Sequence, residues 1–262
     1  MIRGGNFKII ISLLFLIIFL GVVSAAANMA FIVKDDARVE KNYLSIFKEL
    51  NLSVEVIEDA KINSRTNFNK YDIILVNDYL FNLRNTQIYL DISKHKTIMI
   101  NPFEGEEYGL TDKDGISSLT SNAPLSVTYK NSIVQVYNSA TDNRRRALQY
   151  YYLSKENVAP GFERIAGTYK GGSEILGDVI SVANPGARLS TGKITKEKVC
   201  FFGIANSNYW TPAARKMFKD ECVGFVAFEV ICHNDSECND NDSYTKDTCV
   251  NQGTENSFCK NE

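Results

Sequence analysis

The sequence of 262 residues predicts an α/β fold, with a doubly wound, mostly parallel sheet and a small disulfide-stapled C-terminal module. Three observations lead to this prediction. Uninterrupted apolar runs, typical of central parallel strands that are buried on both faces, span residues 72–77 and 97–101. Strand-like and helix-like patterns precede these runs in the order found in doubly wound sheets. Finally, residues 232–262 contain four of the six cysteines and almost no aliphatic side chains.

The overall composition is that of an ordinary globular protein. The chain has 29 basic and 31 acidic side chains, a net charge of −2, and 44% hydrophobic residues. These values exclude wholesale disorder and a protein that spans the membrane many times. Phosphate binding needs a concentrated basic face, so we expect no nucleic-acid partner.

Residues 1–27 have the three parts of a secretory signal. Arg3 and Lys8 precede an apolar run over 9–23, and a small-residue cleavage site follows at 24–27. A spanning helix needs about 20 apolar residues, so a cleaved signal peptide and a retained N-terminal membrane anchor both remain open. In either case the rest of the chain lies outside the cytoplasm, and this segment is its one expected contact with a membrane.

Residues 28–230 are predicted to form the α/β domain. Its first half is expected to contain a strand over 29–35, an amphipathic helix over 39–50 and an alternating strand over 53–58. The second half is expected to contain the following elements: a hairpin over 125–137, a helix over 144–155, strands over 164–169, 179–183 and 198–204, and a closing helix capped by Thr211 and Pro212.

The closing segment resembles a known family. The strand 199–204, a short loop, Thr211 and the helix that follows look like the last strand and helix of glutamine-amidotransferase-like domains. The likeness is to their ThuA-like relatives, which are not amidotransferases, and the Gly-rich stretch 172–187 also resembles such domains. The resemblance covers about residues 29–230 and implies a flavodoxin-like, amidotransferase-like sheet.

The residues that catalytic members of that superfamily need are missing. Those members place a cysteine on a tight strand-to-helix turn and a histidine later in the chain, because the thiolate needs a base. Here the strand 97–100 runs into Asn101 and Pro102, and the one histidine of the domain, His95, precedes that strand. No other nucleophile or metalloprotease motif occurs. We therefore predict no catalytic residues.

A ligand site is nevertheless predicted where the strands end. In open α/β sheets, ligands bind beyond the carboxyl ends of the strands. Carboxylates, amides and aromatic rings there would suit a sugar, a peptide or a weakly held metal, but such residues also cap turns without binding anything. The candidate ligand-binding residues are Asp35, Asp36, Asn77, Asp78, Asn101, Glu104, Asn206, Tyr209 and Trp210, with Lys34, Tyr79 and Phe103 beside them.

Residues 231–262 form the predicted cysteine-rich acidic module. A segment with so few apolar residues needs covalent staples. Its cysteines lack the close spacing of zinc sites, and an exported chain favours disulfides, so we expect Cys232, Cys238, Cys249 and Cys259 to form two bridges in one of three pairings. In the domain, Cys200 and Cys222 are expected at similar heights on neighbouring elements, either bonded or free.

The tail resembles a small cysteine-rich module of secreted and surface proteins, which implies an extracellular role in interaction. We expect no cofactor or resident metal. Calcium is the ion that Asp240, Asp242 and Asp247 could bind, but the segment lacks the glycine and glutamate of an EF-hand loop. Three Asn-x-Ser sequons offer glycosylation sites, at Asn51, Asn234 and Asn241.

These observations favour a non-catalytic extracellular or cell-surface binding protein, whose partner is a glycan or a protein ligand. A second hypothesis is a secreted carbohydrate-active or other hydrolase that uses strand-end carboxylates such as Asp35 and Glu104 as acid and base. A third is a structural envelope component, in which the α/β domain only presents the tail.

Overall fold

A computed structural model describes residues 27–112, 115–171 and 173–227, and in the tail residues 232, 234–239, 246–250, 252–253 and 257–261. Residues 1–26 of the predicted signal or anchor segment, which spans residues 1–27, lie outside the described residues. Within the described ranges, none of the helices has both the length and the apolar character needed to cross a membrane.

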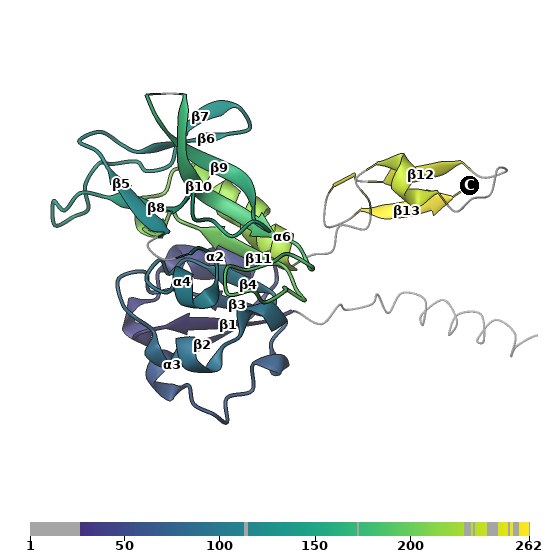
Figure 1. Ribbon diagram of the computed structural model, residues 1–262, viewed down its shortest axis with the longest axis horizontal. Coiled ribbons are helices and arrows are strands. Elements are labelled where there is room, and N and C mark those ends of the chain that lie inside the picture. The colour runs from purple at the N-terminus through teal and green to yellow at the C-terminus, as the bar shows by residue number, and fades with distance from the viewer. Residues whose placement is uncertain are drawn as a thin grey trace, which may run out of the picture.

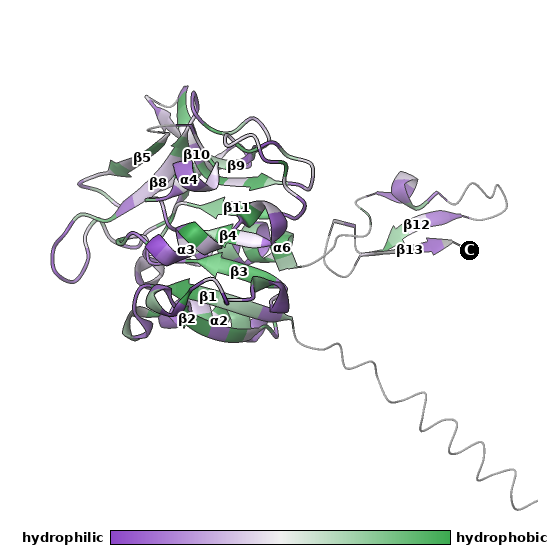
Figure 2. Cartoon of the chain, turned by 60° about the horizontal axis from the view of Figure 1, so that its bottom comes forward, coloured by the Kyte–Doolittle hydropathy of each residue, from purple (hydrophilic) through white to green (hydrophobic). Residues whose placement is uncertain are grey.

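Five parallel strands form one half of the main sheet (Figure 1). In sheet order they are β2 (Ser53–Glu58), β1 (Asn28–Val33), β3 (Ile73–Val76), β4 (Thr97–Met99) and β11 (Val199–Phe202). Every residue of β3, β4 and β11 is buried, and Figure 2 shows hydrophobic residues along these strands. The apolar runs therefore predicted the central strands correctly, because helices cover both faces of this half.

The crossover helices explain why the sheet is doubly wound. Helix α2 (Lys41–Glu49) connects β1 to β2, and helix α3 (Arg84–Tyr89) lies between β3 and β4. Since β2 and β4 lie on opposite sides of the β1–β3 pair, right-handed crossovers place the two helices on opposite faces. Short helices complete this half: η1 (Asp36–Arg38), η2 (Asp59–Lys61), η3 (Phe68–Lys70), η4 (Ile92–Lys94), α4 (Gly105–Tyr108) and η5 (Ser207–Tyr209).

An antiparallel half continues the sheet beyond β11, so the sheet is mixed. Its strands, in order from β11, are β10 (Glu174–Ala183), β9 (Glu163–Lys170), β6 (Ser126–Tyr129) and β7 (Ser132–Gln135); β8 (Gln149–Ser154) pairs with β10 and with β5 (Ile116–Thr120). The predicted hairpin over 125–137 is confirmed as β6 and β7. The predicted helix over 144–155 is wrong, because Tyr150 and Leu153 are buried on a strand that pairs with two neighbours.

The closing helix follows β11 and joins the aromatic core. Helix α5 (Pro212–Met217) continues through a π-helical segment (Phe218–Gly224) into α6 (Phe225–Ala227). The hydroxyl of Thr211 accepts a hydrogen bond from the amide of Ala214 at 3.1 Å, as predicted for its N-cap. Phe218 packs edge-on against Tyr43 of α2 and against Phe202 of β11, so the helix is fixed on the α2 face of the sheet.

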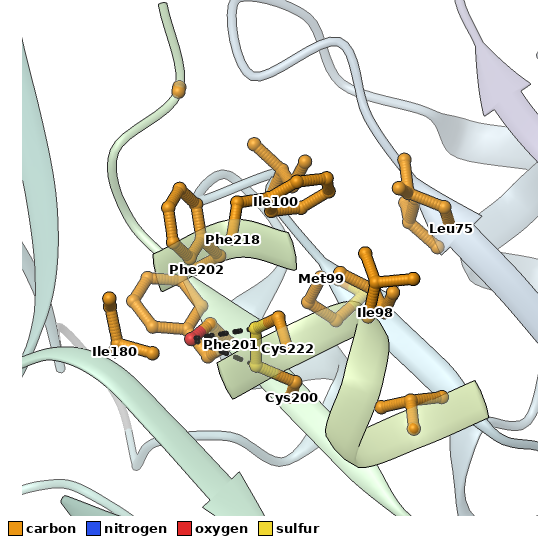
Figure 3. Close-up of a cluster of buried hydrophobic side chains, with 14 of the residues drawn as sticks. Leu75, Ile98, Met99, Ile100, Ile180, Cys200, Phe201, Phe202, Phe218 and Cys222 are labelled. Atoms are coloured by element: carbon orange, nitrogen blue, oxygen red, sulfur yellow. Dashed lines mark hydrogen bonds between the residues drawn. A yellow bond between two sulfur atoms is a disulfide. The ribbon is translucent and has the colours of Figure 1, made fainter. Parts of the chain in front are cut away.

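A disulfide joins this helix to the sheet. Cys200 of β11 and Cys222 of the π-helical segment are bonded, with 5.5 Å between their Cα atoms, and both are fully buried. Figure 3 shows the bridge among Ile98, Phe201 and other apolar side chains. Of the two alternatives that the sequence left open for these cysteines, the structure therefore has the bonded one.

The tail contains a short hairpin with its own disulfide. Helix η7 (Asp235–Cys238) precedes strands β12 (Asp247–Val250) and β13 (Phe258–Asn261), which pair antiparallel. Cys232 is bonded to Cys249, and Cys238 is also disulfide-bonded. The side chain of Cys259 lies outside the described residues. Disulfide bonds are thus present in both the domain and the tail, and the pairing of Cys232 with Cys249 lies within the tail.

Candidate functional site

A cavity of about 600 Å³ opens at the carboxyl ends of the parallel strands. Its walls come from the end of β1 with the start of α2, from the loop after β3, from the loop between β7 and β8, and from the loop after β11. The lining residues are Val33, Glu40, Asn77, Asp78, Tyr79, Leu80, Phe81, Asp142, Asn143, Arg144, Arg146, Asn206, Asn208 and Tyr209. Four of the predicted site residues, Asn77, Asp78, Asn206 and Tyr209, are therefore brought together.

The loop after β3 contributes two buried polar residues to the lining. Asn77 is only 6% exposed, and its amide N–H donates to the carbonyl of Ile32 at 3.0 Å. Its side-chain Oδ1 is buried and has no hydrogen-bond partner among the described residues. Asp78 follows with a φ of 64°, in the left-handed region, and its carboxylate accepts from the amide of Lys34 at 2.8 Å. This backbone conformation is uncommon for a non-glycine residue and clusters at functional sites.

Asn101, two residues after β4, is hydrogen-bonded to the loop after β3 and does not line the cavity. It is fully buried, and its side-chain Nδ2 donates to the carbonyls of Asn77, Asp78 and Phe81 at 3.5, 3.4 and 3.0 Å. Its Oδ1 accepts from the amide of Phe103 at 2.8 Å. Asn101 was predicted as a ligand-binding residue, but its hydrogen bonds make it a residue that positions the cavity loop.

Two tyrosines connect the cavity loops to one another. The hydroxyl of Tyr79 donates to Oδ1 of Asn206, which links the loops after β3 and β11. Burial, together with the charge of Glu40, raises the pKa of Tyr79 well above its usual range, so the phenol stays protonated. The hydroxyl of Tyr209 accepts from the amide of Asn143 at 2.8 Å, which links the loop after β11 to the β7–β8 loop.

Glu40 supplies a half-buried carboxylate at the wall made by the start of α2. Its Oε2 accepts from the amide of Ser207 at 2.7 Å and from the Ser207 hydroxyl. Burial raises the pKa of Glu40, and the hydrogen bonds from Ser207 oppose this shift. Within the described part of the chain Glu40 makes no ion pair, so its charge is held by neutral donors alone.

The β7–β8 loop brings two arginines to the cavity, which the sequence analysis missed. The carboxylate of Asp142 accepts from the amides of Arg144 and Arg146 at 2.8 and 2.9 Å and pairs with the Arg146 guanidinium at 2.7 Å. These bonds, the amide of Arg146 first, lower the pKa of Asp142. The guanidinium of exposed Arg144 has no partner among the described residues. Helical spacing had suggested a helix here, whereas the Asp142-Asn143 pair is the turn signal that was available.

The remaining predicted site residues lie away from the cavity lining. Asp35 caps η1 by accepting from the amide of Ala37 at 3.0 Å. The carboxylates of Asp35, Asp36 and Glu58 have oxygens within 4.8 Å of one another, an acidic cluster at the surface. Trp210 is 7% exposed and donates from Nε1 to the carbonyl of Ile204 at 2.8 Å, so it belongs to the core.

Glu104 is fully buried beside α3 and is not part of the cavity lining. Its Oε1 accepts from the amide of Leu83, while its Oε2 has no hydrogen-bond partner in the described structure. Burial raises the pKa of Glu104 to about 7. Asp35 and Glu104, which the hydrolase hypothesis paired as acid and base, therefore do not share the cavity.

The glycosylation and calcium candidates are placed as follows. Asn51 is exposed in the turn after α2, with a φ of 54°. Asn234 caps η7 by accepting from the amide of Ser236 at 3.0 Å. Asn241, Asp240 and Asp242 lie outside the described residues, and Asp247 lies on β12.

The lining of the cavity is rich in carboxamides, carboxylates and tyrosines. Its fourteen residues, all of them described, include no cysteine, serine or histidine. Carboxamides both donate and accept hydrogen bonds, and carboxylates only accept. Such a lining can hold a polar ligand in a fixed orientation.

No family model matches the chain, and no curated protein matches it. Among solved structures, it is similar to a glutamine amidotransferase from Thermotoga maritima, with 11% sequence identity and a TM-score of 0.34. The match covers 74% of this chain and 83% of that one.

Proposed function

We propose that this protein is a non-catalytic binding protein of the extracellular space or cell surface, and that the strand-end cavity binds a glycan or a protein ligand. The observation that carries the proposal is Asn77, which lines the cavity and whose buried side-chain oxygen has no hydrogen-bond partner among the described residues. A buried polar atom without a partner costs free energy, about 1–3 kcal/mol. A ligand that donates a hydrogen bond to Asn77 would remove this cost.

The state of the other polar groups supports binding over catalysis. Glu40 is bonded to Ser207, Asp142 to Arg146, and Tyr79 to Asn206. The fourteen lining residues include no serine, cysteine or histidine that a neighbouring base could activate as a nucleophile. Groups held by such hydrogen bonds provide a preorganised surface, which favours affinity because little order must be gained on binding.

The composition of the cavity fits a polar ligand with hydroxyl or amide groups. Four asparagines line it, at positions 77, 143, 206 and 208, and two tyrosines add aromatic surface. A volume of about 600 Å³ lies in the usual range for small-ligand sites. A mono- or disaccharide unit, or a short peptide end, is a ligand of this size and polarity.

The proposed location depends on the N-terminal signal together with the cysteines. Disulfides form in oxidising compartments, and the bridges Cys200–Cys222 and Cys232–Cys249 are compatible with an exported chain. The acidic, cysteine-rich tail would act there as a second interaction module beside the amidotransferase-like domain.

A glycan and peptide array tests the proposal directly. The secreted chain from residue 28 onward is applied with and without calcium, beside the Tyr209→Ala variant. The matched control is Tyr89→Ala, which removes an exposed tyrosine outside the cavity. We expect binding to a defined set of ligands that is lost in Tyr209→Ala and kept in the control. Equal binding by all three proteins, or by none, would contradict the proposal.

A further inference from the structure

We infer that Arg144 makes the cavity selective for an acidic ligand, because its guanidinium receives a carboxylate group of that ligand. This inference rests on the proposed function and narrows it to one class of ligand. The carboxylate is either that of an acidic sugar or the C-terminal carboxylate of a peptide, since both present the same planar –COO⁻ group.

The first argument is the bonding state of the charged side chains that line the cavity. There are five of them: Glu40, Asp78, Asp142, Arg144 and Arg146. The three carboxylates all accept hydrogen bonds within the fold, and the Arg146 guanidinium is paired with Asp142. Of the five charged groups, the guanidinium of Arg144 alone has no partner among the described residues. A ligand carboxylate would therefore meet a cation that the fold does not already use.

The second argument is the position of Arg144. Its side chain is exposed and lines the cavity, so a ligand in the cavity can reach it. The preceding residue, Asn143, donates from its amide to the hydroxyl of Tyr209, another lining residue, at 2.8 Å. Asn138 donates from its amide to the carbonyl of Tyr209 at 2.8 Å as well. These bonds fasten the β7–β8 loop to the loop after β11, so Arg144 is held at the cavity.

The third argument is the backbone of the loop around Arg144. The carboxylate of Asp142 accepts from the amides of Arg144 and Arg146, and the amide of Asp142 donates to the carbonyl of Arg146 at 2.8 Å. Arg145 has a φ of 60°, in the left-handed region, which is uncommon for a non-glycine residue and clusters at functional sites. Arg145 does not line the cavity, whereas the arginines on both sides of it do. The strained residue thus lies between two arginines that the loop brings to the cavity.

The chemistry of the guanidinium favours a carboxylate over a neutral group. Its N–H donors form a planar fork that matches the two oxygens of a carboxylate, and hydrogen bonds between two ionised groups are stronger than neutral ones. Glu40 and Asp78 enter the lining from the start of α2 and from the loop after β3, and they would repel an anion. We therefore place the acidic group of the ligand at the β7–β8 loop and its neutral part at the strand ends.

Matched acidic and neutral probes test the inference on the chain from residue 28 onward. One set of pairs consists of glycans that end in glucuronic acid or in glucose, and the other of peptides that end in a free carboxylate or in a carboxamide. Arrays select the pair that binds best, and isothermal titration calorimetry measures both of its members. We expect the acid to bind at least about tenfold more tightly than its neutral partner, which corresponds to about 1.4 kcal/mol. The set that shows the difference identifies the source of the carboxylate.

Two variants of the same loop assign the effect to Arg144. Arg144→Gln and Arg145→Gln remove the same charge from neighbouring exposed positions, but only Arg144 lines the cavity. We expect Arg144→Gln to bind the acid about tenfold more weakly and the neutral partner as the wild type does. Arg145→Gln, the matched control, should keep the preference for the acid. Unfolding followed by the fluorescence of the single tryptophan verifies that each variant is folded.

Three results would overturn the inference: neither set of pairs shows a preference for the acid, Arg144→Gln keeps that preference, or Arg145→Gln loses it to the same extent as Arg144→Gln. In each of these cases the proposed function would still stand if Tyr209→Ala lost the ligands found on the first array. Failure of that array would instead contradict the proposed function, so the two outcomes are distinguishable.

Discussion

The loops after β3 and after β4 each begin with a buried asparagine, and the two asparagines are bonded in opposite ways. Asn101, after β4, donates to three carbonyls and accepts from an amide. Asn77, after β3, lines the cavity, and its buried side-chain oxygen has no partner among the described residues. The same residue type thus has a fully bonded side-chain oxygen in one loop and an unpartnered one in the other.

Two glutamates near the strand ends, Glu40 before α2 and Glu104 after β4, also differ in their surroundings. Glu40 lines the cavity and accepts hydrogen bonds from Ser207. Glu104 is fully buried next to α3 and is not part of the cavity lining. A polar residue at the end of a strand is therefore not by itself evidence of a binding site. Its bonding and its access to a cavity decide whether it has a structural or a binding role.

The largest expected effect comes from removing Asn101. Asn101→Ala removes its hydrogen bonds to the carbonyls of the loop after β3 and to the amide of Phe103, although the carbonyl of Asp78 still accepts from the amide of Phe81. We therefore expect the free energy of unfolding to fall by about 3 to 4 kcal/mol. Ligand binding should also weaken, because the loop after β3 loses its support. Urea denaturation measures the change, with Asn69→Ala as an exposed control. A loss below about 1 kcal/mol would show that Asn101 does not position the loop.

The second effect is a pH dependence that Glu104 introduces. Its pKa is raised by burial to about 7 in the folded chain, above the usual 4.5, so folding favours the protonated form. Stability from this group is full below about pH 4.5 and is lost as the pH rises toward 7 and above. We expect Glu104→Gln, which stays neutral, to be more stable than the wild type at pH 8 by about 2 to 3 kcal/mol.

The same comparison contains its own control, because the advantage of Glu104→Gln should disappear near pH 4. Unfolding free energies measured across this range decide the point. A constant difference between variant and wild type at all pH values would contradict the raised pKa.

A smaller effect is expected at the link between the two cavity loops. Tyr79→Phe removes the hydroxyl that donates to Asn206 and keeps the ring. We expect a loss of about 1 kcal/mol in unfolding free energy, the usual value for one neutral hydrogen bond. Weaker ligand binding should accompany it, as the loops become less fixed. Tyr89→Phe, at an exposed tyrosine, is the matched control, and an equal effect in both variants would refute the link.

The smallest stability effect is expected for Asn77→Ala. The substitution relieves the cost of a buried oxygen that has no partner among the described residues, and it loses the packing of the side chain. Because these two effects oppose each other, unfolding free energy should change by less than about 0.5 kcal/mol, in contrast to Asn101→Ala. Denaturation of the two variants under one condition provides the comparison. A large loss in Asn77→Ala would mean that its side chain is structural after all.

Much of the parallel half could be predicted from the sequence, because continuous apolar runs such as 72–77 have few alternatives to buried strands. The antiparallel half was less accessible. Residues 149–154 were expected to belong to a helix over 144–155, and the three consecutive tyrosines at 150–152 show neither helical spacing nor strand alternation that would distinguish the two. Pairing with β5 and β10 decides the outcome, and such long-range contacts leave no local signal.

The candidate site was predicted in part. The rule for strand ends selected Asn77, Asp78, Asn206 and Tyr209 correctly as neighbours, because parallel strands end at one edge. It could not separate Tyr209 from Trp210, which is next in sequence but lies in the core. The rule also did not select Arg144, which lies on the β7–β8 loop and not at a strand end of the parallel half. Long-range contacts bring this loop to the cavity, such as the hydrogen bond from the amide of Asn143 to the hydroxyl of Tyr209.

The central claim of the proposed function is that Asn77 takes part in ligand binding, because its buried side-chain oxygen has no partner among the described residues. The most direct test is the affinity of Asn77→Ala for a ligand identified on the arrays, measured by calorimetry beside the wild-type chain. We expect binding to be at least about tenfold weaker, a loss of about 1.4 kcal/mol, with unfolding free energy unchanged. Equal affinity in the two proteins would contradict the claim.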